Sequence, residues 1–101
     1  KPSTEKSIDL RIDLFEKLYA REQTIGQSIK SIRKCLGMTQ REYAEKVARM
    51  PLSAFAAIEQ DKANPTIETL SRIAKPMGLE VSFMPSPGTL ELLKEKKKEG
   101  S

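Results

Sequence analysis

Capping signals at Thr24, Thr39 and Thr66 constrain this chain more than any other feature of its sequence. Thr24 is followed three residues later by Gln27, and Thr39 by Glu42. This is the spacing of a capping box, in which two side chains satisfy backbone N–H groups at the start of a helix. Helices that begin at these points are too short to be stable in isolation. The chain therefore has to pack several short helices around a shared core.

Apolar residues recur at steps of three and four between these signals, as they do on one face of an amphipathic helix. The expected helices cover about residues 5–22, 25–36, 39–47, 53–60 and 66–77. Gly37 and Gly78 are expected to end helices, Pro51 to lie in a first turn, and Pro76 to kink a last turn. The residues expected to face inward are Ile8, Ile12, Leu14, Phe15, Leu18, Tyr19, Ile25, Ile29, Ile32, Cys35, Leu36, Tyr43, Ala44, Val47, Ile67, Leu70, Ile73 and Ala74. The predicted fold class is all-α, a bundle of about five helices.

A short β-strand is expected after the helices, because Leu79, Val81 and Phe83 alternate with Glu80 and Ser82. The sequence predicts no second strand to pair with it. An unpaired strand leaves backbone groups without partners, so we expect pairing with the same strand of a second copy across a two-fold axis. The alternative is an extended segment that lies on the helices of its own chain.

These elements divide the chain into three parts: an N-terminal helical extension (1–24), a central domain with the C-terminal strand (25–84), and a linker with a charged tail (85–101). In the tail, residues 89–98 are expected to form a short amphipathic helix where a partner covers Leu90 and Leu93.

Composition excludes several classes of function. The 101 residues include no His and one Cys, which rules out a zinc site, a disulfide framework and a Cys/His nucleophile pair within one chain. No apolar run reaches the length of about 20 residues that spans a bilayer, and no signal peptide is visible. We therefore expect a cytoplasmic protein that is not an enzyme and has no cofactor, metal, membrane partner or small-molecule substrate.

The net charge of +4 is concentrated in the middle of the chain, where residues 25–60 carry six basic and three acidic side chains. Such an excess suits an anionic partner such as a phosphate backbone. Within that segment, Lys30, Arg33 and Lys34 are interpreted as a solvent-exposed face.

The order of motifs along residues 25–84 resembles the Xre family of λ-repressor-like helix-turn-helix regulators. The resemblance rests on Thr39-Gln40 at one helix start, Ile58-Glu59 near the end of the next helix, and Asn64-Pro65-Thr66 before a third. It implies that the second helix of the motif enters the major groove of double-stranded DNA, while the first directs its positive N-terminus at a phosphate. It also implies that Glu59 supports the motif structurally.

The resemblance assigns DNA contacts to two kinds of residue. Phosphate contacts are expected from Thr39, Gln40, Arg41, Arg49, Lys62 and Asn64, although Thr39 also serves as a helix cap. The base-facing positions carry Leu52, Ser53, Ala54 and Ala57, of which only Ser53 can hydrogen-bond to a base edge. Compared with the family pattern, the turn near Ala48 and Arg49 has one extra residue.

The helical domain, the strand and the charged tail together look like HipB-type antitoxins, which repress their own operons and bind HipA-like kinase toxins. This likeness implies a homodimeric repressor with an operator site and a toxin partner. Three alternatives stay open: a HigA-type antitoxin, an ordinary Xre regulator without a toxin, and a protein-interaction module with little DNA specificity.

Overall fold

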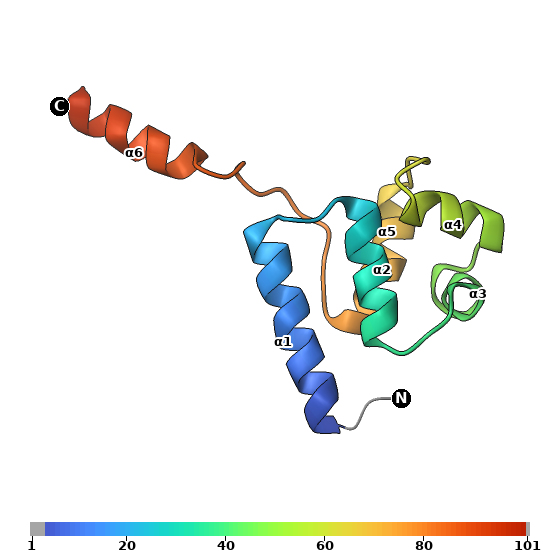
Figure 1. Cartoon of the computed structure of the whole chain (residues 1–101). Coiled ribbons are helices and arrows are strands. Elements are labelled where there is room, and N and C mark those ends of the chain that lie inside the picture. The colour runs from blue at the N-terminus through green and yellow to red at the C-terminus, as the bar shows by residue number, and fades with distance from the viewer. Residues whose placement is uncertain (1–3, 101) are drawn as a thin grey trace.

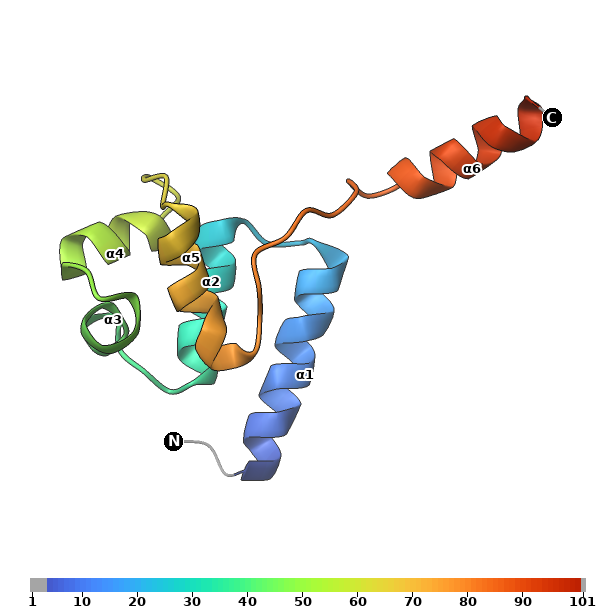
Figure 2. The same ribbon diagram turned by 180° about the vertical axis from the view of Figure 1, so that it is seen from behind.

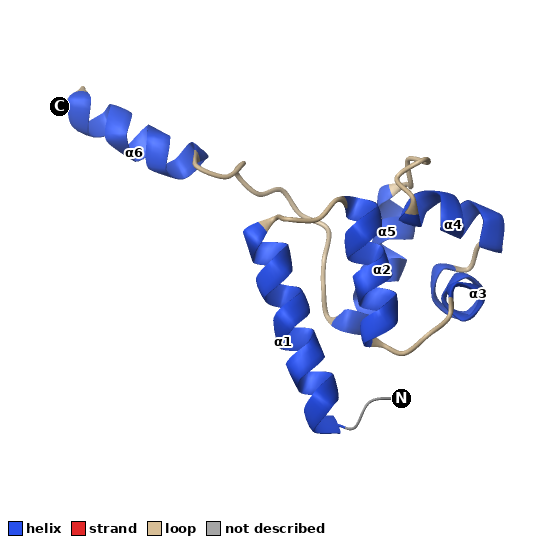
Figure 3. Ribbon diagram, in the orientation of Figure 1, coloured by secondary structure: helices blue, strands red, loops and turns tan. Residues whose placement is uncertain are grey.

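A computed structural model describes residues 4–100 as helices joined by loops, with no β-strand among them (Figures 1 and 3). This confirms the all-α bundle for that part of the chain. Within the same range, no helix combines the length and the apolar character needed to cross a membrane. The helical elements are α1 (Thr4–Ala20), α2 (Ile25–Cys35), α3 (Gln40–Tyr43), η1 (Ala44–Ala48), α4 (Leu52–Glu59), α5 (Ile67–Ala74), η2 (Lys75–Met77) and α6 (Thr89–Glu99).

The capping signals place three helix starts where the sequence predicts them. Thr24 Oγ1 accepts a hydrogen bond from the backbone N–H of Gln27, whose side chain accepts one from the N–H of Thr24. Thr39 and Glu42 form the same reciprocal pair at the start of α3. Thr66 caps α5. Local hydrogen bonds therefore set these boundaries.

The core lies where α2, α3, η1, α4 and α5 meet. Tyr43, Phe55 and Ile73 are its largest fully buried side chains. The rings of Tyr43 and Phe55 have centroids 5.6 Å apart, and the Tyr43 hydroxyl donates to the backbone oxygen of Ile73 at 2.5 Å. Burial raises the pKa of Tyr43 to about 12. Other buried members are Leu14, Ile29, Ile32, Ala44, Ala48, Ile58 and Met77.

Five residues expected in the core lie at the surface instead, and Ile8 and Ile12 on α1 are two of them. Tyr19, Ile25 and Ile67 are 81%, 59% and 72% exposed. Ile25 and Ile67 stand in the first turns of α2 and α5, at the rim of the bundle. Helix α1 packs against α2 through the side that carries Leu14 and Leu18, so Tyr19 faces away. Helical periodicity identifies an apolar stripe without showing which part of it another helix covers.

The expected β-strand is not formed in the single chain. Residues 79–84 have no regular secondary structure and run from the end of η2 to beside the end of α1 (Figures 1 and 2), and the described residues include no neighbouring strand to pair with them. Leu79 packs partly against the core, whereas Val81 is 43% exposed and the side chain of Phe83 is completely exposed. The alternative expectation was a segment that lies on the helices of its own chain, and among these side chains only Leu79 does so.

The tail differs from its expectation, because α6 forms a helix without any partner covering Leu90 and Leu93. Figure 2 shows α6 projecting away from the other helices at the end of the linker. The Arg21 guanidinium donates to the backbone oxygen of Pro85 and so holds the start of this linker beside the end of α1.

Candidate nucleic-acid interface

The extra residue in the turn is absorbed by a π-helical turn, η1, which continues directly from α3. The N–H groups of Arg49 and Met50 both donate to the carbonyl of Ala44, so one residue more than usual fits into the turn. Arg49 then takes a left-handed conformation, with φ of 56°. This places the extra residue between Ala44 and Arg49, next to the position that the sequence indicates.

Glu59 joins α2, α3 and α4 from inside the bundle. Its carboxylate accepts hydrogen bonds from Arg33 Nε at 2.7 Å, from Arg33 Nη2 at 3.2 Å and from Gln40 Nε2 at 3.0 Å. A further guanidinium N–H of Arg33 donates to the backbone oxygen of Met38 at 2.9 Å. These bonds set the relative positions of α2, α3 and α4. They support the structural role expected for Glu59.

The prediction that Arg33 lies on a solvent-exposed face was wrong. Its side chain is 10% exposed and that of Glu59 is 3% exposed. Arg33 therefore contributes a buried ion pair and no positive surface charge. Gln40 also donates one amide N–H to Glu59. Its role in the fold is therefore established, while its contact with a phosphate stays a prediction.

Asp61 fixes the loop after α4 to the start of α2, a role that the sequence analysis missed. Its carboxylate accepts hydrogen bonds from the Gly26 N–H at 2.8 Å and from the Thr24 hydroxyl at 2.5 Å. Gly26 permits this close approach, because a Cβ there would lie 2.5 Å from the backbone oxygen of Glu59. The loop that carries Lys62 and Asn64 is therefore held at both ends, by Asp61 and by the cap at Thr66.

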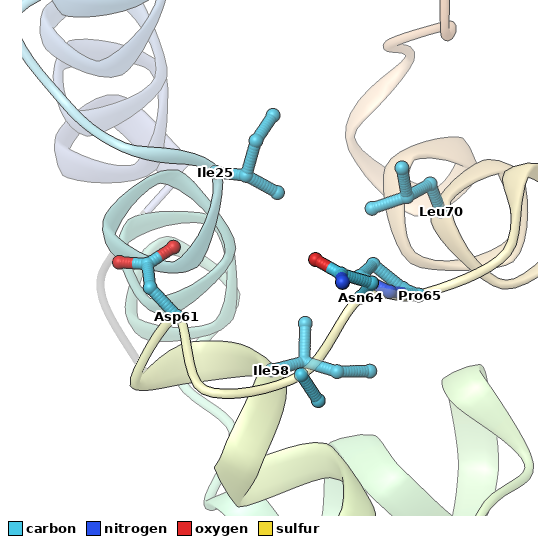
Figure 4. A pocket seen from close by; sticks show the side chains of 7 residues that line it. Ile25, Ile58, Asp61, Asn64, Pro65 and Leu70 are labelled. Atoms are coloured by element: carbon cyan, nitrogen blue, oxygen red, sulfur yellow. The ribbon is translucent and has the colours of Figure 1, made fainter.

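A small surface pocket of about 190 Å³ lies between that loop and the start of α2 (Figure 4). Ile25, Ile58 and Leu70 supply apolar walls, and Asp61 and Asn64 stand on opposite sides. The Asp61 carboxylate is already engaged by α2. We assign the pocket no ligand.

The outer face of α4 is the part of the motif left free for a partner. Phe55, Ile58 and Glu59 point inward and are buried, while Ser53 and Gln60 are exposed. No side chain caps the start of α4, so its first backbone N–H groups face outward with the positive end of the helix dipole. Among the expected base-facing residues, Leu52, Ala54 and Ala57 are half-buried, and Leu52 packs against the core.

Gln60 is a base-reading candidate that the sequence analysis missed. It lies seven residues after Ser53, and a spacing of four and then three residues through Ala57 places all three on one helix face. A glutamine side chain can form two hydrogen bonds to adenine in the major groove. The spacing from Ser53 through Ala57 is visible in the sequence and could have identified Gln60 as a base-reading candidate.

Apart from Gln40, the expected phosphate-contacting residues lie on three segments that precede or follow α4 in the chain. Thr39 and Arg41 lie at the start of α3, Arg49 in the turn, and Lys62 and Asn64 in the loop after α4. All five are exposed. Arg41 lies 3.7 Å from Glu45, a pair that solvent screens because both side chains are more than half exposed. Each side chain can therefore turn toward an anionic partner.

Two helical segments joined by a tight turn, with the outer face of the second left free, define a helix-turn-helix module. A family model described as helix-turn-helix matches residues 29–84, more than half of the chain. The chain belongs to this helix-turn-helix family, in its Xre, λ-repressor-like form.

Curated relatives with this module are regulators by name. The immunity repressor protein of Bacillus phage phi105 is 43% identical over 67 residues, which are 66% of this chain and 46% of the repressor. The HTH-type transcriptional regulator PuuR of Escherichia coli K12 is 40% identical over 57 residues, which are 56% of this chain and 30% of PuuR. The chain thus spans less than half the length of either relative. No solved structure matches it significantly.

Proposed function

We propose that this chain is a sequence-specific DNA-binding repressor that places α4 in the major groove. The observation that carries the proposal is the outer face of α4, where Ser53 and Ala57 lie on the same side as the C-cap residue Gln60, on a helix whose N-terminus has no side-chain cap. A helix of this diameter fits the major groove, where base edges present distinct hydrogen-bonding patterns. The names of the phage and bacterial relatives support a role in repression.

Phosphate contacts are proposed to supply most of the affinity. Thr39, Gln40, Arg41, Arg49, Lys62 and Asn64 flank α4 on both sides along the chain. Base reading is modest by comparison, because Ser53 and Gln60 are the hydrogen-bonding side chains on the outer face and Leu52, Ala54 and Ala57 offer only apolar contact with thymine methyl groups. DNA shape and half-site spacing add to the specificity.

The proposed repressor is a homodimer joined through residues 79–83. Val81 and Phe83 are exposed in the single chain, and the backbone of this extended segment has no ladder partner. Antiparallel pairing of two such segments, with Leu79, Val81 and Phe83 on one face, covers the apolar side chains and satisfies the backbone. A two-fold dimer then presents its two α4 helices to half-sites about 34 Å apart.

We further propose that the protein acts as a HipB-type antitoxin in the cytoplasm, represses its own operon and binds a HipA-like kinase toxin. No catalysis is proposed, since the chain has no His and a single Cys. The support is the order of helix-turn-helix domain, extended segment and charged tail. Co-purification with the product of the adjacent gene tests the toxin partner, and a monomeric or dimeric repressor that binds no such product would leave a regulator without a toxin.

A second candidate is a protein-interaction module with little DNA specificity. The alanine residues at positions 54, 56 and 57 favour it, because they reduce the hydrogen bonds that α4 can offer to bases. This candidate predicts weak DNA binding that does not depend on sequence.

Fluorescence anisotropy separates the two candidates. The wild-type chain and the variant Ser53→Ala/Gln60→Ala are titrated with DNA from upstream of the gene and with scrambled DNA at several salt concentrations. A repressor prefers the upstream DNA, and the double variant loses that preference while keeping the salt dependence. Equal, weak and steeply salt-dependent binding of both DNAs by the wild type would contradict the repressor.

Single-cation variants locate the phosphate contacts in the same assay. Lys62→Ala is expected to lower the slope of log K against log salt by about one. Lys17→Ala, on the distant helix α1, is the matched control and leaves the slope unchanged. Equal slopes for both variants would remove Lys62 from the interface.

A further inference from the structure

Helix α1 carries two separate apolar stripes, and only one of them is used within the chain. Leu14 and Leu18 face the core, while Ile8, Ile12 and Tyr19 are 53%, 49% and 81% exposed. Positions 8, 12, 15 and 19 follow steps of four, three and four, so Phe15, which is half-buried and packs against the core, lies at the inner edge of the same stripe. The outer stripe of α1 is defined here as Ile8, Ile12, Phe15 and Tyr19.

An acidic row borders this outer stripe on one side. Asp9, Asp13 and Glu16 are exposed and lie next to it on the helix surface, at steps of four and three residues. If two α1 helices packed antiparallel through their outer stripes, the acidic rows would lie next to one another. Like charges at that distance repel. The outer stripe therefore suits a partner helix that is apolar and basic.

Helix α6 has the complementary character. Leu90 and Leu93 are 49% and 58% exposed, and with Lys94 and Lys97 they follow steps of three, one and three residues along one side of the helix. The 11 residues of α6 span about 16 Å. The outer stripe of α1, from Ile8 to Tyr19, has about the same length. The two faces are complementary in charge, and the two helical segments have similar lengths.

The linker directs α6 away from the α1 helix of its own chain. Arg21 holds the carbonyl of Pro85 beside the end of α1, and Pro85 and Pro87 favour an extended backbone between this point and α6. Figure 1 shows that α6 continues outward from there. In an antiparallel pair centred on Val81, each Pro85 would stand opposite Met77 of the second copy, on the side of that copy's bundle.

We propose that α6 of each chain docks on the outer stripe of α1 in the second copy of the dimer, so that the two chains exchange their C-terminal arms. Leu90 and Leu93, which lie one helical turn apart, contact the middle of the outer stripe at Ile12, and Lys94 and Lys97 lie beside the acidic row of Asp9, Asp13 and Glu16. This inference rests on the homodimer proposed above and assigns a partner to both exposed helix faces.

Disulfide trapping tests the arm exchange in the full chain. In a Cys35→Ser background, one tagged chain carries Ile12→Cys and a second, differently tagged chain carries Leu93→Cys; the two are mixed and oxidised. Arm exchange yields a disulfide between the two tags at least about tenfold faster than the matched pair Ile12→Cys with Leu92→Cys, because Leu92 faces away from Leu93 and Leu90 on α6.

The other outcomes overturn the proposal in distinguishable ways. A chain that carries both Ile12→Cys and Leu93→Cys and forms only an internal disulfide shows that α6 folds back on its own α1. Preferred cross-linking of Ile12→Cys with itself shows that α1 pairs with α1. A dimer by analytical ultracentrifugation that gives no α1–α6 disulfide removes the arm exchange and keeps the homodimer, whereas a monomer removes both.

Charge reversal gives an independent test. Asp9→Lys/Asp13→Lys is expected to raise the dimer Kd about tenfold, the combined effect of several exposed charge pairs. Adding Lys94→Glu/Lys97→Glu to the same chain restores the wild-type Kd, since the pairs are re-formed with opposite sign. Two charge reversals that weaken the dimer additively would contradict contact between the acidic row and α6.

Discussion

At the scale of single residues, the Arg33–Glu59 pair shows how much the motif depends on one buried contact. The two side chains are 10% and 3% exposed, and Glu59 also accepts a hydrogen bond from Gln40. A buried ion pair gains little over a well-packed apolar pair, but removing one partner strands the other charge away from water. The pair therefore matters more for what its loss does than for its net strength.

Glu59→Ala is expected to lower the free energy of unfolding by about 3–5 kcal/mol, because it leaves the Arg33 guanidinium buried without its counter-charge. Arg33→Met/Glu59→Leu removes both charges and is expected to lose less than half of that amount. Urea unfolding measures both variants, provided that the m-value stays constant. A double variant as unstable as Glu59→Ala would show that the loss comes from packing.

The raised pKa of Tyr43 predicts that the protein loses stability at alkaline pH. Its pKa is raised from 10.0 to about 12 by burial, so the folded state keeps the phenol proton that the unfolded state releases. The stabilisation is complete below about pH 10 and is lost as the pH rises toward 12. Tm measured from pH 9 to 11.5 should fall more steeply for the wild type than for Tyr43→Phe, which retains every titrating Lys. Parallel curves of Tm against pH for the two proteins would contradict the raised pKa of Tyr43.

At the scale of elements, the π-helical turn lets this chain keep the helix-turn-helix geometry with an additional residue. The carbonyl of Ala44 accepts two N–H groups, and Arg72 Nε donates to the carbonyl of Ala48 at 3.0 Å. These bonds satisfy the backbone where the helix ends. The left-handed Arg49 completes the turn before Pro51 starts the approach to α4.

Arg49→Gly is expected to raise the free energy of unfolding by about 0.5–1 kcal/mol, because glycine adopts φ of 56° without the steric penalty of a side chain. It should also weaken DNA binding and lower its salt slope by about one, through loss of a phosphate contact. Arg49→Ala is the matched control, which loses the charge and keeps the strained backbone. Equal stability of the two variants, from thermal unfolding, would contradict the strain.

At the scale of the whole molecule, the proposed homodimer depends on residues 79–83. Phe83→Ser is expected to weaken the dimer at least about tenfold, since it removes an aromatic side chain that is fully exposed in the single chain and covered in the pair. The free energy of unfolding of the single chain should be unchanged in Phe83→Ser, because the side chain is fully exposed there. Sedimentation equilibrium measures the dimer Kd, with Ser82→Ala on the opposite face as control. An unchanged Kd would place the dimer interface elsewhere.

The helix boundaries could be predicted because their determinants are local. Thr24, Thr39 and Thr66 each bond to a residue three positions later, and Gly78 ends its helix in a left-handed conformation of its own. The helix-turn-helix order was visible for the same reason, as a series of such boundaries with helical periodicity between them. A cap depends only on residues that are already neighbours in the chain.

Only the tertiary structure decided which side chains are buried and which surfaces stay free. Asp61 reaches Gly26 across 35 positions, and Arg33 reaches Glu59 across 26. No local pattern marks such partners, because the distance between them depends on how the helices pack. Tyr19 illustrates the converse, since its periodic position suits a core and the packing of α1 on α2 leaves it exposed. The sequence by itself therefore determined the helix starts at Thr24, Thr39 and Thr66, whereas the strand expected from Leu79, Val81 and Phe83 did not form in the single chain. Burial, the Glu59 network and the outer faces of α1 and α4 followed from long-range packing.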